Sequence, residues 1–286
     1  MPDSEPRRGQ AILSLNAYSP AEIQEAIETV GVTKVDMPFL PCFMLAVVAG
    51  GSIGFGALYF TIVSSDADLS FATGRLLGGL VFSLGLTLVL VAGAELFTGN
   101  NLIVMAWASG KVSMARMLRN WVIVFFGNLV GALGLVVLVV LSRHLEMNNG
   151  RLAQAAIATA SAKIGPDVVT LFFKGILCNV LVCMAVWIAS AGRSVTDKIV
   201  GLVLPISAFV AAGFEHSIAN LYFLPLAWLV VHTGAAPANI DVSAITVAGI
   251  VHNLVPVTLG NIVGGAGLVG FVYWAIYRKG FAAAAK

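Results

Sequence analysis

The stretch Ala212-Gly213-Phe214-Glu215-His216-Ser217-Ile218-Ala219-Asn220 lies near the middle of an apolar run, residues 199–231, and decides the fold. Glu215 and His216 are the only acidic or basic residues of that run. As one helix the run would be about 50 Å long, against a bilayer hydrocarbon core of about 30 Å. It is therefore either steeply tilted or broken, and two ionisable residues beside a glycine favour a break. Charge at the bilayer centre costs about 3 kcal/mol or more, and non-helical backbone there must be buried in protein or line a cavity. The stretch predicts a site at the membrane midplane; a buried Glu–His pair that only locks helix packing is the alternative.

The composition excludes an ordinary soluble domain. Of 286 residues, 59% are hydrophobic and only 10% are charged, which is typical of a protein with several membrane spans. A formal net charge of +2 gives no reason to expect a nucleic-acid partner. The first 36 residues are polar and contain no apolar core of a cleavable signal peptide. Cys42, Cys178 and Cys183 all fall in apolar runs, so we expect buried small side chains rather than a disulfide or a metal site.

We expect six transmembrane helices, at about residues 38–63, 76–109, 121–141, 168–191, 199–231 and 244–277. The sixth span should start with a separate or kinked turn before Pro256. Three segments follow from this division: a cytoplasmic N-terminal segment 1–36, a channel domain 37–280 and a C-terminal tail 281–286. Lys163 falls in a polar connection, residues 142–166.

The N-terminal segment contains one predicted helix. Ser19-Pro20-Ala21-Glu22 is a capping box with proline at the first helical position, and Gly31 marks an expected end. Ile23, Ile27 and Val30 fall on one side of this short amphipathic helix, and its glutamates, including Glu28, on the other. It would lie at the membrane surface or against a neighbouring subunit, or form a solvated cap.

The distribution of Lys and Arg predicts the orientation. Most of them lie in the N-terminal segment, the second-to-third and fourth-to-fifth connections and the C-terminus. This bias places both termini in the cytoplasm, and an even number of spans satisfies it. We expect a multi-pass protein of the plasma (inner) membrane.

Two motifs recur in the same order and indicate an internal repeat. Ala92-Gly93-Ala94-Glu95 followed by Asn100 matches Ala212–Glu215 followed by Asn220 at identical offsets. The next span of each half then carries Gly127-Asn128-Leu129-Val130-Gly131 or Gly260-Asn261-Ile262-Val263-Gly264. Halves of three spans each, about 37–142 and 167–277, must be inverted relative to one another, and paired broken helices then mark a substrate path at the midplane. Convergent use of small residues in packed helices is the alternative.

The two breaks bring a small set of polar groups towards one zone. Thr98 offers a hydroxyl, and His216 has the side chain that titrates nearest neutral pH. Amides on neighbouring helices come from Asn128, Asn179 and Asn261. Bulky apolar residues flank the zone and are read either as the necks of a pore or as ordinary packing: Phe82, Leu86, Leu96, Phe97 and Phe209. Lys163 either attracts anions or is a solvated charge.

The chain resembles the formate/nitrite transporter family, most closely its formate channels. The resemblance covers nearly the whole chain after residue 36, and its most specific motifs are Gly93–Thr98, Asn179–Cys183, Gly213–Asn220 and Pro256–Asn261. It implies an aquaporin-like fold and a homopentamer in which each subunit has its own pore. It implies a central His216 oriented by Glu215, Thr98 and Asn261. It also implies an outer hydrophobic slit at Phe82 and Phe209, an inner one at Leu86 and Leu96, and a vestibule lysine, Lys163.

The resemblance leaves the substrate open within the family. The stretches 172–175 and 248–254 are closer to its nitrite channels, whereas 192–198 and 203–205 are closer to its formate channels. Our hypothesis is a passive or proton-coupled conduit for small monovalent anions, formate first, with nitrite or hydrosulfide as alternatives. A bare anion would lose its water in the slits at a cost of several kcal/mol, whereas the neutral acid would not. His216, directly or through Thr98 and a water, would lend a proton at the midplane.

Two other classes compete with this hypothesis. A neutral-solute pore of the aquaporin type is disfavoured because Asn-Pro-Ala is absent from both breaks. A haem-binding redox subunit would need paired histidines on facing helices, and only His216 of the four histidines lies clearly in mid-membrane. The sequence has no nucleotide-binding or nucleophilic motif, so we expect neither enzyme activity nor a cofactor.

Overall fold

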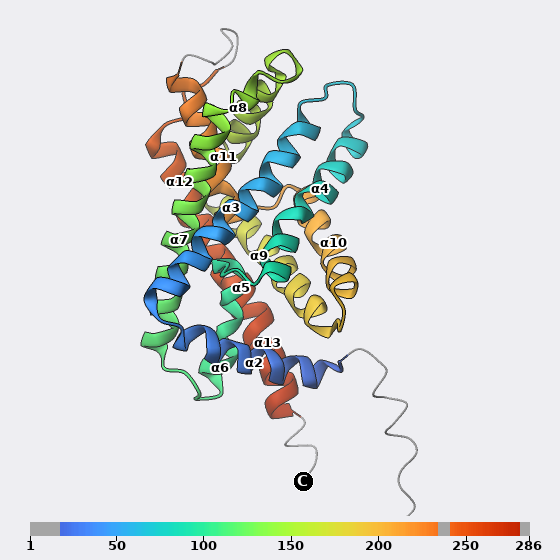
Figure 1. Ribbon diagram of the computed structural model, residues 1–286, viewed down its shortest axis with the longest axis vertical. Helices are drawn as coiled ribbons and strands as arrows, with labels where there is room; N and C mark the ends of the chain where they lie inside the picture. The colour runs from blue at the N-terminus through green and yellow to red at the C-terminus, as the bar shows by residue number, and fades with distance from the viewer. Residues whose placement is uncertain (1–17, 234–240, 281–286) are drawn as a thin grey trace, which may run out of the picture.

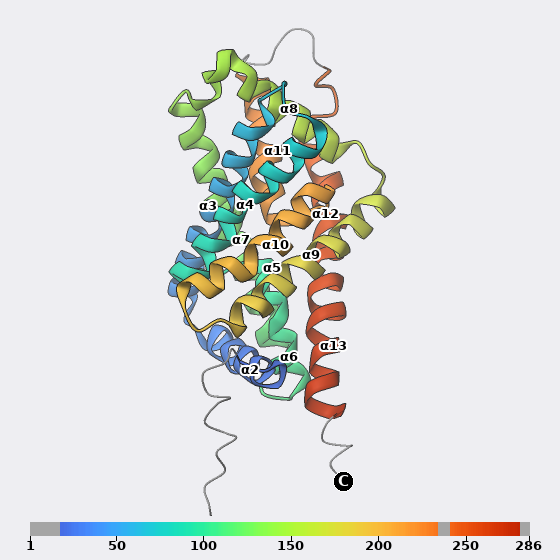
Figure 2. The same ribbon diagram turned by 90° about the vertical axis from the view of Figure 1, so that its right-hand side faces the viewer.

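Six long apolar helices form the body of the protein in a computed structural model, which describes residues 18–233 and 241–280 (Figures 1 and 2). The six candidate membrane spans are Phe39–Ser64 (α3), Phe71–Ala92 (α4), Met114–Leu141 (α7), Val168–Ala191 (α9), Val195–Ala212 (α10) and Val247–Tyr277, which begins with α12 (Val247–Ile262). The prediction of an all-helical protein with six spans is confirmed. The predicted tail 281–286 and residues 1–17 of the predicted N-terminal segment lie outside the described residues.

Both overlong runs are broken where the sequence predicts it. Helix α4 ends at Gly93 and α10 ends at Gly213, and each glycine adopts a left-handed conformation, with φ of 79° and 73°. This conformation favours glycine because a side chain there would be strained. After four non-helical residues the chain resumes as α5 (Phe97–Asn100) and α6 (Val104–Ala108), or as α11 (Ser217–His232).

The two halves repeat the same packing upside down. Helix α3 packs against α4 and α7, α9 packs against α10 and α12, and α4 and α10 pack against each other across the pseudo-symmetry axis. Helix α4 descends towards the middle of the molecule, whereas α10 rises towards it (Figure 1). A short helix precedes each half: α2 (Pro20–Asp36) covers the lower end and α8 (Arg151–Ile164) the upper end.

Several boundaries differ from the prediction. Helix α2 continues through Gly31 to Asp36, because that glycine lies close against Ala106 and packs instead of ending the helix. The polar connection 142–166 contains α8, whose alanine-rich sequence has high helix propensity. Helix α7 begins at Met114, seven residues before the predicted span.

The sixth span starts after a separate turn, one of the two predicted forms, in which the Ile245 N–H donates to the Val242 oxygen at 2.9 Å. A kink at Pro256 is absent from α12, which passes through that proline without interruption, and the irregularity comes later, in a π-helical segment, Val263–Phe271 (η4). Neighbouring helices allow a membrane helix to tolerate the missing N–H of a proline.

Close helix crossings explain the second repeated motif. Gly131 faces the backbone oxygen of Val47 on α3, and Gly260 faces that of Phe172 on α9. A Cβ atom at either glycine would overlap that oxygen, so the helices approach as closely as their backbones permit. The repeated Gly-Asn-x-Val-Gly motif therefore has a packing role in both halves.

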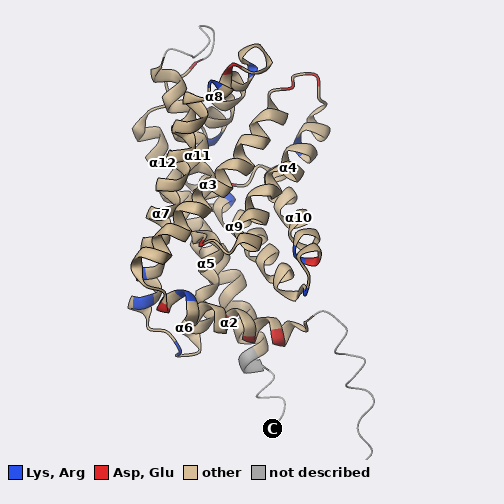
Figure 3. Cartoon of the chain, viewed as in Figure 1, with Lys and Arg blue, Asp and Glu red and all other residues tan. Residues whose placement is uncertain are grey.

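Helix α2 is anchored through a buried carboxylate, so the predicted placement of Glu28 on the polar face is wrong. Glu28 is 1% exposed and accepts hydrogen bonds from Gln24 (2.7 Å) and Ser109 (2.8 Å). It also pairs with Lys111 at 2.6 Å, while Val30, predicted on the apolar side, is 50% exposed. Burial raises the pKa of Glu28, but the bonds from Lys111, Ser109 and Gln24 outweigh it and lower that pKa below 4.5. Positive and negative residues gather at the two ends of the molecule (Figure 3).

A glycine substitution tests the helix crossing. We expect Gly260→Ala to destabilise the protein by about 1–3 kcal/mol, because the new methyl group meets the Phe172 carbonyl. Gly267→Ala on the same span is the matched control, since a Cβ there meets nothing within 4 Å. The measurement is the apparent melting temperature in detergent, and equal melting temperatures for the two variants would contradict the crossing.

The anchor of α2 predicts a pH dependence. Since the folded-state pKa of Glu28 is lowered, its stabilisation is present at neutral pH and is lost as pH falls below 4.5 through that pKa. We therefore expect Glu28→Gln to speed hydrogen exchange of the α2 amides at pH 7, with the difference from wild type shrinking as pH falls below 4.5. A difference that stays the same as the pH is lowered would rule out the carboxylate as the anchor.

Candidate functional site

His216 and Thr98 meet at the centre of the molecule, where the two breaks approach each other. The His216 Nε2 atom lies 2.9 Å from the Thr98 hydroxyl, and the two residues are 2% and 0% exposed. His216 is also the N-cap of α11, and its Nδ1 atom accepts a hydrogen bond from the Ala219 N–H at 3.0 Å. An Nδ1 atom that accepts this bond carries no proton, so the proton of the neutral ring is on Nε2 and points to Thr98.

Two cavities lie on the two sides of the breaks: the upper one is lined by His216, and the lower one is lined by Leu96 and Gly99, close to Thr98 in the chain. The upper cavity, about 390 Å³, is lined by His216, Phe82, Phe209, Lys163 and further residues. The lower cavity, about 180 Å³, lies beside α2 and is lined by Leu86, Leu96 and Lys34 among others. The two pairs named for hydrophobic slits thus fall in different cavities, Phe82 with Phe209 in one and Leu86 with Leu96 in the other. The rings of Phe82 and Phe209 meet edge to face at 5.6 Å, and Phe209 stacks on His216 at 5.8 Å.

Phe97 fits ordinary packing, one of the two roles that the sequence leaves open for it. Its ring packs edge to face against Phe125 at 5.2 Å and Trp121 at 6.3 Å, and it is not among the residues that line either cavity. It is the first residue of α5, and its backbone N–H donates to the Asn128 side chain at 3.0 Å. Phe97 is therefore a packing residue.

Two asparagines hold the breaks in the same way. The Asn261 amide donates to the backbone oxygens of Gly175 (2.8 Å) and Glu215 (2.9 Å), and its side-chain oxygen accepts from the Ser217 N–H (2.9 Å). In the other half, Asn128 donates to Ala46 and Glu95 and accepts from the Phe97 N–H, with distances of 2.7, 2.9 and 3.0 Å. Asn261 thus positions the backbone on both sides of His216 and does not touch the imidazole.

The two glutamates next to the breaks sit in matching polar clusters. Glu215 pairs with Lys163 at 3.2 Å and accepts bonds from the Asn220 and Asn253 amides at 2.7 and 3.3 Å. Glu95 pairs with Lys34 at 2.7 Å and accepts from Asn100 at 2.7 Å, and Asn100 in turn donates to Asn120.

One expectation from the resemblance differs from the structure. The Glu215 carboxylate is bonded to Lys163 and asparagines rather than to the imidazole, so it fixes the α11 side of the break. Lys163 lies in α8, within the polar connection 142–166, and its charge is partly neutralised by that carboxylate. It still lines the upper cavity, with 15% of its side chain exposed.

Asn179 acts through Thr98. Its amide donates to the Thr98 backbone oxygen at 3.3 Å, to the Asn261 backbone oxygen at 2.7 Å and to the Asn101 side chain at 2.8 Å. It links α9 to the Thr98 side of the first break and to α12, and these three bonds do not include His216.

The sequence analysis missed Lys34, Asn120 and Asn253. A signal for all three exists in the repeat: each of the two clamp asparagines, Asn128 and Asn261, has another asparagine eight residues before it. Lys34 likewise precedes the first residues of α3 at the spacing at which Lys163 precedes those of α9. The short helices α2 and α8 are thus part of the repeated unit, each contributing one lysine to one glutamate.

The sequence and the fold agree on one family. A profile of the formate/nitrite transporter family matches residues 21–275. The chain belongs to the formate/nitrite transporter family. It is 42% identical over 273 residues to the formate channel FocA of Escherichia coli (strain K12), covering 91% of this chain and 94% of that protein.

Two solved structures of this family have the same fold. One is described as a pentameric formate channel with formate bound; it has a TM-score of 0.78 and 41% identity and covers 84% of this chain and 98% of its own. The other, an FNT family ion channel, has a TM-score of 0.77 and 30% identity and covers 88% and 98%. The protein is accordingly a channel of the formate/nitrite transporter family, and its six spans make it a multi-pass membrane protein.

No group of three or more His, Cys, Asp or Glu side chains within residues 18–233 and 241–277 is arranged to hold a metal ion. All three cysteines are buried and unpaired, as their positions in apolar runs predict. The chemistry of the central pair is that of hydrogen-bond donation: Nε2–H to the Thr98 oxygen, which leaves the Thr98 hydroxyl proton to donate onward.

A clamp substitution tests the geometry of the breaks. We expect Asn261→Ala to destabilise the protein by about 2–4 kcal/mol, because three buried backbone groups lose their partner. Asn128→Ala should destabilise the protein by a similar free energy. The measurement for both variants is the apparent melting temperature in detergent. Ser52→Ala is the control, since its hydroxyl bonds only to Val48 of its own helix. A clamp variant as stable as this control would refute the assignment.

Proposed function

We propose that this protein conducts small monovalent anions, formate first, past His216 and Thr98 at the membrane midplane. The observation that carries the proposal is the buried His216–Thr98 hydrogen bond, with His216 in the lining of the upper cavity and Gly99, the neighbour of Thr98, in the lining of the lower one. The identity to FocA of E. coli over 91% of the chain supports formate as the first candidate.

The apolar residues that line the two cavities make it costly for an anion to lose its water. Phe82 and Phe209 line the upper cavity, and Leu86 and Leu96 line the lower one, with each side chain at most 3% exposed. Stripping water from a bare anion there costs several kcal/mol, whereas the neutral conjugate acid crosses with a much smaller penalty. A polar donor at the midplane is what lets an anion pass between two such apolar zones.

The polarity of the central pair indicates how it acts. Because Nδ1 accepts from Ala219, the resting imidazole is neutral and Thr98 receives its Nε2–H. An anion beside Thr98 then accepts a hydrogen bond from the Thr98 hydroxyl, whose oxygen in turn accepts the hydrogen bond from the imidazole. Protonation of His216 requires Nδ1 to give up the Ala219 bond, so a proton reaches the ring only at the expense of the α11 N-cap. This geometry favours a polar relay over a permanently stored imidazolium, with proton transfer confined to the time when the anion is bound.

The proposal includes a homopentameric assembly and an orientation of the chain in the membrane. The solved formate channel similar to this chain is a pentamer, and only 22% of the apolar window of α10 is buried within a single subunit. A homopentamer would cover exposed apolar side chains while leaving one passage in each subunit. Both termini are proposed to face the cytoplasm, so that α2 covers the cytoplasmic end of each passage in the inner membrane.

Nitrite and hydrosulfide are the second candidates, because both are small monovalent anions whose conjugate acids are neutral. The degree to which nitrite or hydrosulfide competes with the uptake of labelled formate into proteoliposomes ranks the three anions as substrates. Water permeability in stopped flow tests the aquaporin-like alternative.

The relay is tested by replacing the imidazole. In proteoliposomes with a formate gradient, we expect His216→Phe to lower formate flux by about 100-fold and to abolish its dependence on pH between 5 and 8. His252→Phe is the control, because that histidine is exposed and bonds only to the Pro166 backbone oxygen. Unchanged flux and unchanged pH dependence in His216→Phe would overturn the relay.

A further inference from the structure

The two cavities differ in charge although the repeat makes their frameworks alike. The upper cavity is lined by Arg75, Lys163, Lys174 and Glu215. Among the residues that the structure describes, Lys34 is the one charged residue that lines the lower cavity, and it is paired with Glu95. Since Lys163 is paired with Glu215, the excess charge of the upper cavity comes from Arg75 and Lys174. Within residues 18–233 and 241–277, neither of these two forms an ion pair.

Arg75 reaches across the break to the end of the opposite half-helix. Its Nε atom donates to the Ala211 backbone oxygen at 2.7 Å, and its Nη2 atom lies against Gly213. Ala211 is one of the last residues of α10, whose final carbonyl groups have no partner within the helix and carry the negative end of its dipole. Uncompensated, this end would repel an anion in the upper cavity, and the guanidinium reverses the sign of the local charge.

Lys174 lies on α9 two turns from its start, at the edge of the break. Its backbone oxygen accepts the Glu215 N–H at 3.3 Å, just as Leu45 accepts the Glu95 N–H in the other half. The corresponding position in the other half is therefore an apolar residue, Leu45. Counting back along each half-helix from its break glycine, Arg75 of α4 likewise corresponds to Val195 of α10. An unpaired lysine within a membrane span is costly unless it serves a pathway.

We propose that Arg75 and Lys174 form the anion-collecting site of the upper cavity and make the passage electrostatically one-sided. The ligand is a small monovalent anion, and the inference rests on the proposed function. The two side chains form no hydrogen bond with His216 or Thr98. They raise the anion concentration in the upper cavity, before the anion reaches the apolar zone. Low-dielectric walls focus such a field, and salt screens it. Lys163, paired with Glu215, holds the break and contributes less to this field.

The test compares the two directions of flux. Right-side-out and inside-out membrane vesicles expose opposite ends of the channel, and the initial rate of [14C]formate uptake gives a half-saturating concentration for each end. The variants are Arg75→Gln and Lys174→Leu, the second placing at that position the residue type that Leu45 provides in the other half. Arg151→Gln is the control, because it removes an exposed charge of α8 at the same end that does not line the cavity. Arg75→Lys keeps the charge while changing the cap.

We expect each neutral variant to raise the half-saturating concentration about 3- to 10-fold for uptake from the α8 end alone. Uptake from the α2 end, Arg151→Gln and Arg75→Lys should stay close to wild type, and about 1 M salt should remove the difference. A fall in the maximal rate from both ends with unchanged half-saturation would overturn the proposal and make Arg75 a purely structural cap. If wild-type vesicles take up no more formate than vesicles without the protein, the proposed function fails instead.

Discussion

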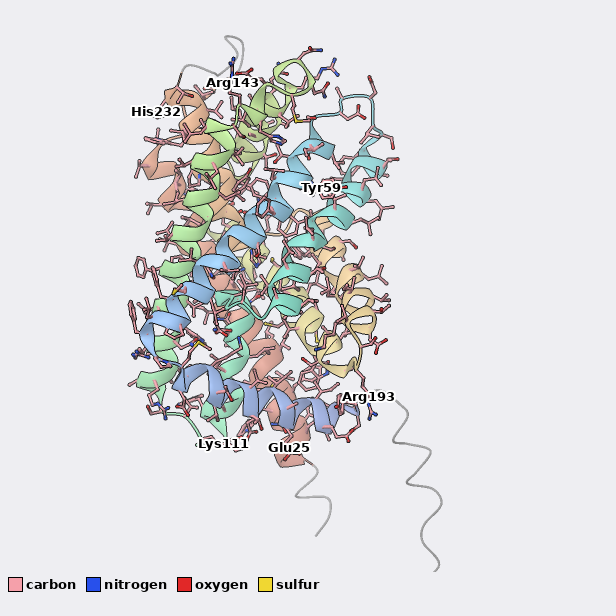
Figure 4. All side chains as sticks on the ribbon, viewed as in Figure 1. Glu25, Tyr59, Lys111, Arg143, Arg193 and His232 are labelled. Atoms are coloured by element: carbon pink, nitrogen blue, oxygen red, sulfur yellow. The ribbon has the colours of Figure 1, made fainter. Side chains whose placement is uncertain are left out.

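The structure depends on satisfying the backbone of two helix breaks inside a membrane. Non-helical N–H and C=O groups find no water there, so protein groups must bond to them. Asn128 and Asn261 do this with the same three bonds in each half, two donated to backbone oxygens and one accepted from the first N–H of the returning helix. Because their own helices cross α3 and α9 through glycines, the two amides come close enough to reach the breaks. Side chains fill the space between these helices (Figure 4).

The clamps and the lysine–glutamate pairs have different roles. Breaking a buried ion pair is strongly destabilising, but an intact pair is weak grounds for net stability because desolvation offsets the attraction. Lys34–Glu95 and Lys163–Glu215 are better understood as links that fix α2 and α8 to the breaks they cover. Each short helix is thereby held beside the cavity at its own end. With both breaks fixed, His216 has little freedom: its Nδ1 caps α11 and its Nε2 faces Thr98.

The sequence predicted the breaks, the inverted repeat and the meeting of Thr98 with His216, because each rests on a local rule. A charge in an apolar run, a glycine at the end of a half-helix and identical motif offsets are visible without coordinates. It did not predict that Glu215 turns away from the imidazole, since the direction of a side chain beside a break depends on partners distant in the chain, here Lys163 and Asn253. The sequence could not decide between a pore neck and packing for Phe97, because its aromatic partners on α7, Trp121 and Phe125, are distant in the chain. Gly31 was read as a helix end and Pro256 as the site of a turn or kink, and tertiary packing overrode both local preferences.

The central claim is that an anion passes beside the His216–Thr98 pair. The most direct measurement is a cryo-electron microscopy map of the protein in lipid nanodiscs with saturating formate. The account predicts density for a small anion within hydrogen-bonding distance of the Thr98 hydroxyl or the His216 ring, in each subunit and between the Phe82–Phe209 and Leu86–Leu96 pairs. A continuous passage that bypasses this pair, with His216 enclosed by packed side chains, would contradict it.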